Sequence, residues 1–525
     1  MQKLLLLCAF LVTCFTYAQE ISVKSKTSEI FKDSKKNTSL LFSESDGQGG
    51  FITIRQYVNG FTRAPKGYYI DHYDANLKQV NEAEVEIDNN QIKGLMINNG
   101  TVFILETSLD KKADVFNFNI LESPLGSFNF QKRTLFSLNE AEVKKYFGIG
   151  ISFFFINNGF NQMDSNPFGE VTFSAKKNFF CVNFDIKDKE SQTQRLYVFD
   201  KNFTPVFQRE FKRKILDKLF QYENIDVDDK TGEIYLLGKV FENNSTRTKK
   251  KGKANYNYEL HKITATEEKS VSFSPNDNFI GSLFTVRGKN SISCAGFYSE
   301  KNDYRYKGVC RFNLDPETLE ITQQSYMPFS EEFIKDKYGK VKDKELKNLS
   351  FRSAFINDNE DIVLNAEEFF VTTHTQSTMN GGMMTRSVFN FNDIVSVKIS
   401  RDGELLWARN INKRQATSGA VMEYLSFSST VLNDNTYLFI NCSDKIRKIS
   451  NDRIEFKQGN MKKANLYAIK IDNDGNFTFK NIVDDKASAV SYFVKQGIHT
   501  ASNGSEMIFI GRKKSKKQFL KLNIL

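Results

Sequence analysis

Hydrophobic and polar residues alternate along the segment from Asn392 to Asn412, and related segments recur through the chain. In its first half, every second residue is aliphatic: Val395, Val397 and Ile399. This period is typical of a strand with one buried face. Arg401-Asp402-Gly403 follows, and Asp and Gly accept the backbone angles of a tight turn. The segment therefore predicts a β-hairpin, with Leu405 and Trp407 on the same side of the returning strand.

Eight apolar segments predict the second strand of eight repeats. They span residues 51–58, 101–108, 179–186, 234–240, 291–298, 361–370, 436–443 and 507–513. A third strand follows, and in five repeats it carries Lys or Asn before a final aliphatic residue. These are LHKI (260–263), RFNL (311–314), SVKI (396–399), AIKI (468–471) and KLNI (521–524). The last of them ends just before Leu525, so the final repeat lacks a fourth strand of its own.

Short antiparallel sheets repeated in this way must cover their faces and protect their edges, and packing around a common axis does both. In this general layout the chain resembles the β-propellers, although it has no WD or kelch signature. The resemblance implies an all-β fold, a single propeller of about eight four-stranded blades, with seven as the next count. A strand between Ile21 and Ile30 is expected to complete the last blade. The alternative is a pair of β-sandwich domains.

Two segments interrupt the strand pattern. Residues Ser137 to Phe147 and Ser330 to Leu349 have a helical composition with mixed charge. Both lie between consecutive repeats. We expect helices that pack over the ends of the sheets, with a mobile lid as the less favoured alternative.

The first 18 residues have the features of a signal peptide. Lys3 supplies the positive charge, Leu4 to Val12 the short apolar region, and Thr16-Tyr17-Ala18 a cleavage site. We therefore expect a propeller domain over residues 19–525 that is exported to the periplasm or the extracellular space. A lipid anchor at Cys14 is less favoured, because Thr13 stands where a smaller residue is usual. No later segment is long and apolar enough for a transmembrane helix.

Composition supports an ordered, strand-rich protein. Phe (49) and Tyr (20) are abundant and Pro (7) is scarce, which argues against disorder. The formal charge of +10 falls to +9 without Lys3 and favours acidic partners only weakly. Four cysteines lie beyond the first 18 residues, with no CxxC pair, so a zinc site is not expected. Cys294 and Cys310 lie on adjacent predicted strands, where two buried thiols are favoured over a disulfide.

The lengths of the predicted connections are asymmetric. With the strands of a repeat named A to D, the A–B and C–D connections are short turns. The B–C connections include three long segments: Glu242 to Tyr256, Val371 to Asn390, and Asp444 to Lys463. In a propeller, the B–C and D–A connections emerge on the same face. We therefore expect one loop-rich face, and loops on a rigid scaffold are where binding usually resides.

Two of these long loops are basic. The candidate ligand-binding residues are Arg247, Lys249, Lys250, Lys251, Lys253, Lys445, Arg447 and Lys448. Grouped cations attract polyanions such as an acidic glycan or a phosphate polymer. The alternative is a set of solvated loops with no ligand. Nucleic acid is not expected, because export argues against it and no aromatic-interleaved recognition motif is present.

The sequence contains no recognisable catalytic motif. The histidines, His72, His261, His374 and His499, fall in different repeats, and only His374 is expected on the loop-rich face. Asp226 to Gly232 and Asp472 to Gly475 are short of the calcium-loop pattern, so we interpret both as turns. The sequence thus predicts no bound metal and no cofactor.

Two classes of function remain from the sequence. The favoured one is a non-catalytic binding or scaffold protein of the cell envelope, which engages an acidic polymer or a protein partner. The alternative is a propeller glycoside hydrolase or polysaccharide lyase with carboxylates in the axial funnel. Two buried carboxylates with raised pKa values converging on the axis would favour the enzyme.

Overall fold

The structure of the protein is a computed structural model of all 525 residues. It describes residues 21–33, 38–59, 64–144, 167–188, 190–250, 253–273, 278–289, 291–300, 305–340, 346–377, 383–419, 421–444, 446–449, 453–495, 497–499 and 503–525. The predicted signal peptide and Cys14 lie outside these residues. Within them, no helix has the length and apolar character needed to cross a membrane.

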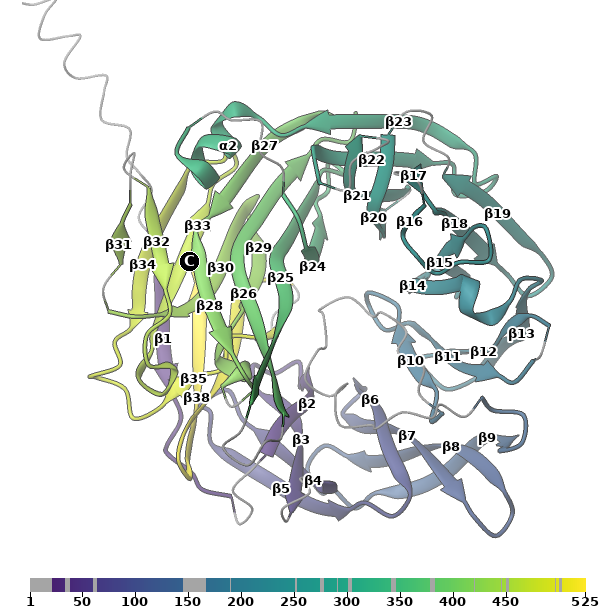
Figure 1. The fold of residues 1–525 in the computed structure, drawn as a ribbon. Helices are drawn as coiled ribbons and strands as arrows, with labels where there is room; N and C mark the ends of the chain where they lie inside the picture. Colours follow the sequence, from purple (N-terminus) through teal and green to yellow (C-terminus); the bar gives the residue numbers. More distant parts are fainter. Residues whose placement is uncertain are drawn as a thin grey trace, which may run out of the picture.

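Antiparallel sheets of four strands surround a common axis, with strand A innermost and strand D outermost (Figure 1). Blade 1 contains β2 (Thr38–Ser45), β3 (Phe51–Asn59), β4 (Ala64–Tyr73) and β5 (Gln79–Glu86). Blade 2 contains β6 (Asn90–Asn98), β7 (Thr101–Asp110), β8 (Val115–Pro124) and β9 (Gln131–Asn139). Blade 3 contains β10 (Glu170–Phe173), β11 (Phe179–Ile186), β12 (Gln192–Asp200) and β13 (Pro205–Arg213).

The next four blades continue in sequence order. Blade 4 contains β14 (Phe220–Val227), β15 (Ile234–Phe241), β18 (Tyr256–Ile263) and β19 (Glu268–Phe273). Blade 5 contains β20 (Asn278–Arg287), β21 (Ile292–Glu300), β22 (Gly308–Leu314) and β23 (Ile321–Pro328). Blade 6 contains β24 (Leu349–Ile356), β25 (Ile362–Ser377), β26 (Met383–Ile399) and β27 (Leu405–Ile411). Blade 7 contains β29 (Phe427–Leu432), β30 (Asn435–Cys442), β33 (Asn465–Ile471) and β34 (Phe477–Val483).

A closing blade joins the two ends of the chain. It contains the short strands β35 (Ser491–Tyr492) and β36 (Ile498–His499), then β37 (Glu506–Lys513), β38 (Lys516–Ile524) and β1 (Val23–Thr27). Strand β1 pairs antiparallel with β38, from Val23 opposite Ile524 to Thr27 opposite Leu520. Figure 1 shows β1, in purple, beside the yellow C-terminal strands. The predicted closure by an N-terminal strand is confirmed, and the described sheets follow the expected propeller plan of about eight blades.

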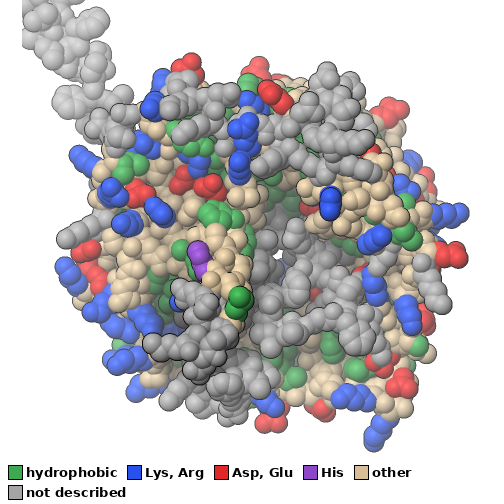
Figure 2. Space-filling view, in the orientation of Figure 1, with side chains coloured by type: hydrophobic (Ala, Val, Ile, Leu, Met, Phe, Trp, Pro, Cys, Tyr) green, Lys and Arg blue, Asp and Glu red, His purple; other side chains and the backbone are tan. Residues whose placement is uncertain are grey.

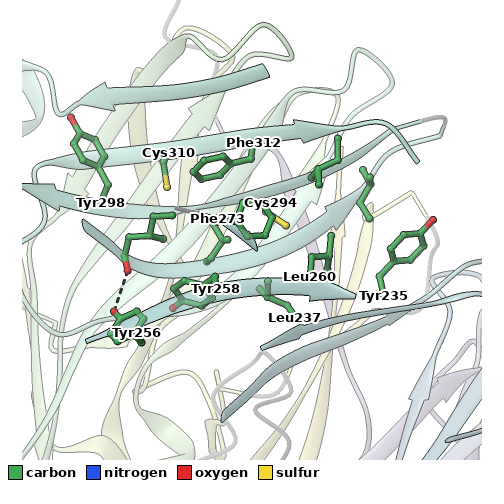
Figure 3. Packing of buried hydrophobic residues seen from close by; sticks show 14 of the residues in the cluster. Tyr235, Leu237, Tyr256, Tyr258, Leu260, Phe273, Cys294, Tyr298, Cys310 and Phe312 are labelled. Atoms are coloured by element: carbon green, nitrogen blue, oxygen red, sulfur yellow. Dashed lines mark hydrogen bonds between the residues drawn. The ribbon is translucent and has the colours of Figure 1, made fainter. Parts of the chain in front are cut away.

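Hydrophobic clusters fill the space between neighbouring blades. Between blades 4 and 5, Tyr258, Leu260 and Phe273 pack against Phe312 and Cys310 (Figure 3). A similar cluster joins the closing blade to blade 1, around Phe51 and Phe519. Hydrophobic packing of this kind continues around the ring. Buried apolar area is the main source of stability, so the blades stabilise one another as parts of a single fold. A pair of separate β-sandwiches is therefore wrong.

The C–D turns of several blades share one hydrogen-bond scheme. In blade 3, Asp200 donates its backbone N–H to Thr204 O (3.0 Å), and its Oδ1 accepts the N–H groups of Asn202 (2.8 Å) and Thr204 (2.9 Å). In blade 7, Asp472 makes the same contacts with Asp474 and Asn476. The aspartates anchor turns, as predicted, and the described residues contain no metal-binding group of three His, Cys, Asp or Glu.

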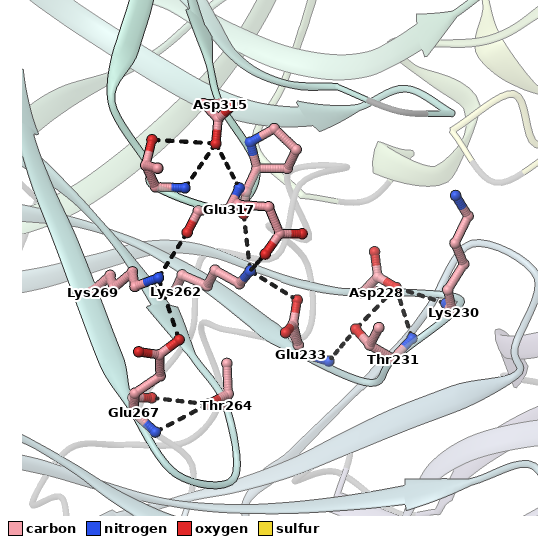
Figure 4. Close-up of polar contacts among 12 residues, drawn as sticks. Asp228, Lys230, Thr231, Glu233, Lys262, Thr264, Glu267, Lys269, Asp315 and Glu317 are labelled. Carbon is pink, nitrogen blue, oxygen red and sulfur yellow. Dashed lines mark hydrogen bonds and ion pairs between the residues drawn. The ribbon is translucent and has the colours of Figure 1, made fainter.

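In three blades, the Lys or Asn near the end of the C strand ties its blade to the next one. Lys262 Nζ donates to Pro316 O of blade 5 (2.9 Å), as Figure 4 shows. Asn313 Nδ2 donates to Arg401 O of blade 6 (2.9 Å). Lys398 Nζ donates to Asn473 Oδ1 of blade 7 (2.6 Å). The motif seen in the sequence is therefore a ladder of inter-blade hydrogen bonds.

One of the two predicted helices is present. Helix α2 (Glu331–Tyr338) begins at Ser330, whose side chain accepts the N–H of Phe333 (3.2 Å), and it ends at Gly339 with φ 76°. Its Phe333 is buried between blades 5 and 6, so it packs over the sheet ends as expected.

The predicted helix from Ser137 to Phe147 is wrong in its described part. Residues Ser137 to Asn139 belong to β9, where Ser137 lies opposite Asn117 of β8. Pairing with β8 completes blade 2, and this ladder outweighs the local helical composition. Residues from 145 onward lie outside the described part of the chain.

Two further details refine the predictions. Cys294 and Cys310 are buried free thiols. The register places Cys294 opposite Phe312 and Cys310 opposite Gly296, so the two cysteines are not direct cross-strand partners.

Trp407 packs between blades 6 and 7, whereas Leu405 packs against the cluster of blades 5 and 6. Their predicted common side is wrong, because the register shifts between Lys398 and Ile399 and turns Leu405 to the other face.

Candidate functional site

The ring has two unlike faces. We call the face with the A–B and C–D turns the turn face, and the face with the B–C and D–A connections the long-loop face. On the long-loop face, the B–C connection of blade 4 carries a two-stranded ribbon, β16 (Lys249–Lys250) and β17 (Lys253–Ala254). That of blade 7 carries β31 (Arg447–Lys448) and β32 (Ile454–Lys457). The described parts of these two connections thus form short strands of their own.

The B–C connection of blade 6 is a β-arm. We define the arm as residues 369–377 of β25 and 383–391 of β26, which pair from Phe369 opposite Phe391 to Ser377 opposite Met383. The prediction treated this segment as a loop, and the structure extends both strands through it. At its base, β28 (Lys413–Thr417) pairs with β26. Further out the arm is exposed, as at Val371, His374 and Met383, the last of which is 82% exposed.

The predicted basic residues lie at separate places on the long-loop face. Arg247 is exposed beside the β16–β17 ribbon, while Arg447 and Lys448 are exposed on β31. Lys251 and Lys445 lie outside the described residues, and only the backbone of Lys249, Lys250 and Lys253 is described. Figure 1 shows β16–β17 and β31–β32 on opposite sides of the ring. Arg447 also lies near Glu455 (3.8 Å).

Basic residues are spread widely over the molecule. In Figure 2, Lys and Arg side chains surround the visible face, with Asp and Glu among them. The two basic loops share a face by topology, but they do not merge into one patch. A ligand that contacts both must therefore be extended.

A buried ionic network fixes the base of the arm. Glu367, on β25, receives Lys413 Nζ (2.7 Å) at one oxygen and Arg352 Nη2 (2.7 Å) with Ser426 Oγ (2.7 Å) at the other. Lys413 Nζ also donates to Phe391 O (2.8 Å). Although burial alone raises it, the charges of Lys413 and Arg352 bring the pKa of Glu367 below its usual value. The network joins the arm, β28 and the loop before β29 into one rigid unit.

Three described carboxyl groups have raised pKa values, and each is paired with an arginine. Burial raises the pKa of Asp71, Asp226 and Asp336. Asp71 binds Arg55 (2.8 Å), Asp226 binds Arg287, and Asp336 binds Arg409 (2.6 Å). They lie on blade 1, blade 4 and helix α2, so no two of them meet. Within the described residues, no two carboxyl groups with raised pKa values lie together: Asp228, which binds Arg287 beside Asp226, has a lowered pKa.

A cavity of 260 Å³ lies on the turn face, where blades 1, 2 and 3 meet. It is lined by Glu44, Met96, Ile97, Asn98, Ala175, Lys176, Lys177, Asn178 and Lys201. The sequence did not predict it, because its lining residues come from short turns and strand ends and not from the long loops. The available signal was the pair Lys176-Lys177 in an A–B turn, a position that Asn and Asp occupy in the corresponding turn of blade 6.

Lys177 is one of the residues that line this cavity. Its Nζ forms an ion pair with Glu44 of blade 1 and donates to Leu95 O of blade 2 (3.2 Å). Its backbone has φ 56°, in the left-handed region. The turn is fixed to blade 4 by Asp229, whose carboxylate accepts the N–H of Lys176 (2.9 Å). The side chains of Lys176 and Lys201 have no ion pair with a described residue, and both residues are exposed.

The chain is similar to several solved structures. The β-propeller domain of the Trilobed protease from Pyrococcus furiosus is 9% identical, with 87% of this chain and 99% of that chain covered and a TM-score of 0.38. The WD40 domain of SCAP from fission yeast is 7% identical, with 95% and 98% covered and a TM-score of 0.38.

Two enzymes are also among the similar structures. The polysaccharide lyase Uly1 is 10% identical, with 95% and 100% covered and a TM-score of 0.34. Prolyl oligopeptidase B from Galerina marginata is 9% identical with a TM-score of 0.37, and the match covers 91% of this chain and 56% of that enzyme. No family model and no curated protein matches the sequence. These likenesses concern the β-propeller fold alone.

Proposed function

We propose that this protein is an exported binding scaffold whose long-loop face engages an acidic partner. The observation that carries the proposal is the β-arm, whose base is fixed by Glu367 and whose outer part is exposed. A rigid and exposed extension loses little conformational entropy when a partner docks against it. Loops held by a rigid scaffold are common binding elements.

The positive charge of the two basic loops indicates the kind of partner. In the order of the blades, the arm of blade 6 lies between the basic ribbon of blade 4 and the basic strand β31 of blade 7. An extended acidic polymer, or an acidic surface of a protein, can contact both basic loops while it lies along the arm. A single exposed charge is screened over about 8 Å at physiological salt. Several of these lysines and arginines must therefore act together.

Binding to immobilised polygalacturonate and polyphosphate tests the proposal, with dextran as the neutral control. We expect weak binding that decreases by about ten-fold or more between 50 and 200 mM salt, because several cations release counterions together. Reversal of Lys249, Lys250 and Lys251 to Glu should abolish it. The matched control reverses Lys78, Lys230 and Lys289, three residues exposed on the turn face.

A second variant tests the arm. Replacement of residues 373–387 by Asn-Gly joins Thr372 to Val388, which are opposite each other in the ladder. The shortened protein should keep its melting temperature and bind the polymers more weakly. Salt-independent binding, or equal losses in the two triple variants, would contradict the proposal. Depolymerisation of the glycan would favour the hydrolase or lyase instead.

A further inference from the structure

The cavity on the turn face is rich in hydrogen-bond donors and positive charge. Three ammonium groups and the amides of Asn98 and Asn178 line it, against the single carboxylate of Glu44. Glu44 is already paired with Lys177. The lining therefore has two ammonium groups in excess, those of Lys176 and Lys201. A concave site with charge of one sign concentrates ligands of the opposite sign.

The lining is held in place before any ligand arrives. Asn98 Nδ2 donates to Lys201 O (3.4 Å), which joins blade 2 to the C–D turn of blade 3. Asn178 Nδ2 donates to Asp229 O (3.4 Å), and Lys177 spans from blade 3 to blades 1 and 2. Four blades thus fix the walls, and Lys176 and Lys201 among the lining residues are exposed. Such preorganisation reduces the entropy cost of binding.

From this arrangement we propose that the cavity is a binding site for a small oxyanion ligand that carries a carboxylate or a phosphate. Its volume of 260 Å³ is below the range of about 300–1,000 Å³ for drug-sized ligands, so the ligand is a small molecule or the end of a chain. Lys176 and Lys201, which have no ion pair with a described residue, bind the oxyanion. Lys177 lines the cavity and keeps its ion pair with Glu44. The site is independent of the long-loop face and of the function proposed for it.

Calorimetric titration with D-glucuronate and with inorganic phosphate tests the site, with D-glucose as the neutral control. We expect one ligand per chain for at least one anion. Binding of glucuronate alone would assign the site to carboxylates, and binding of phosphate alone to phosphates. Binding of both would assign it to oxyanions in general.

Variants locate the binding. Reversal of Lys176 and Lys201 to Glu should weaken it by about ten-fold or more, since charged contacts in a concave site reinforce one another. The control variant Lys78→Glu/Lys289→Glu, at exposed positions of the turn face outside the cavity, should bind as the wild type does. Lysine acetylation read by mass spectrometry should show Lys176 and Lys201 protected by the ligand.

Three results would overturn the proposal. They are no binding of either anion at millimolar concentration, unchanged affinity in Lys176→Glu/Lys201→Glu, or protection confined to lysines of the long-loop face. The neutral variant Lys176→Gln/Lys201→Gln guards against a folding defect, because it removes the charge without introducing repulsion. Its melting temperature should match the wild type while its affinity falls.

Discussion

On the turn face, the C–D turns of blades 3 and 7 repeat one hydrogen-bond scheme, whereas each long connection of the opposite face has its own structure. The turns are fixed locally, by an aspartate that accepts N–H groups two and four residues ahead. The arm is fixed by residues distant in sequence, such as Glu367, Lys413 and Ser426. The turn face is thus a repeated structure, and the long-loop face is assembled from single contacts.

The two faces should differ in how they respond to mutation. A repeated turn can lose one hydrogen bond while its neighbours keep the ring closed. When one member of a unique buried network is removed, the remaining charges stay buried without their partner, and the free energy of unfolding falls. Function is more easily varied on the long-loop face, since its connections can change length without altering the blades.

The largest effect is expected for Glu367→Gln. The substitution leaves the ammonium of Lys413 and the guanidinium of Arg352 buried beside a neutral amide. Breaking a buried ion pair from one side typically costs about 3–5 kcal/mol. Urea unfolding should show a loss of this order. The double variant Glu367→Gln/Lys413→Met should lose less than the two single variants added together, and strict additivity would show that the groups do not interact.

A somewhat smaller loss is expected for Trp407→Ala. Trp407 is 7% exposed and packs between blades 6 and 7. It packs so closely on Gly475 that a Cβ added to this glycine would lie 2.7 Å from the Trp407 side chain. Its removal leaves a cavity and should cost about 3 kcal/mol, at the low end for a core tryptophan, because its Nε1 has no partner within the described residues. Emission of the folded protein at the wavelength of a water-exposed indole would contradict this placement.

The sequence predicts the repeated parts of the fold well and the unique parts poorly. The apolar segment predicted at 179–186 coincides with β11, and the alternation around Val397 gives the correct face of β26. The missing fourth strand of the last repeat correctly predicts closure by the N-terminus. These features depend on local patterns with a period of two.

The failures concern information that a local pattern does not contain. The register shift beside Ile399 turns Leu405 to the other face of its strand. The alternation of apolar and polar residues does not reveal a single extra residue in a strand. The arm was missed because its outer residues, Thr372 to Ser377, are polar on both faces. The cavity on the turn face requires Glu44 and Lys177, which are 133 positions apart, to meet. Such contacts appear only once the ring is closed.

A moderate effect is expected on the turn face for Lys398→Met. Lys398 Nζ donates to Asn473 Oδ1 (2.6 Å) and lies 3.7 Å from Asp361 and 3.6 Å from Asp434. Its loss should cost about 2 kcal/mol, within the range of about 1.5–3 kcal/mol for a hydrogen bond to a charged group. The acids left behind are partly exposed and can be hydrated. A loss as large as that of Glu367→Gln would remove the proposed difference between the faces.

The smallest effect is expected for Asp315→Asn in the C–D turn of blade 5, and it should depend on pH. The Asp315 carboxylate accepts the N–H groups of Glu317 (2.9 Å) and Thr318 (2.8 Å), and these bonds lower its pKa. A carboxyl whose pKa is lower in the folded protein adds stability above the pKa of the unfolded chain, about 3.9. That contribution is lost as the pH falls through the folded pKa. The gap in melting temperature between wild type and Asp315→Asn should therefore be widest near neutral pH and should close below about pH 4. Asparagine keeps the accepting oxygen, so the turn itself should persist. A gap that stays constant from pH 7 to pH 3 would show that Asp315 stabilises the turn through its geometry and not through its charge. The turns of this face would then tolerate substitution even better than their repeated structure implies.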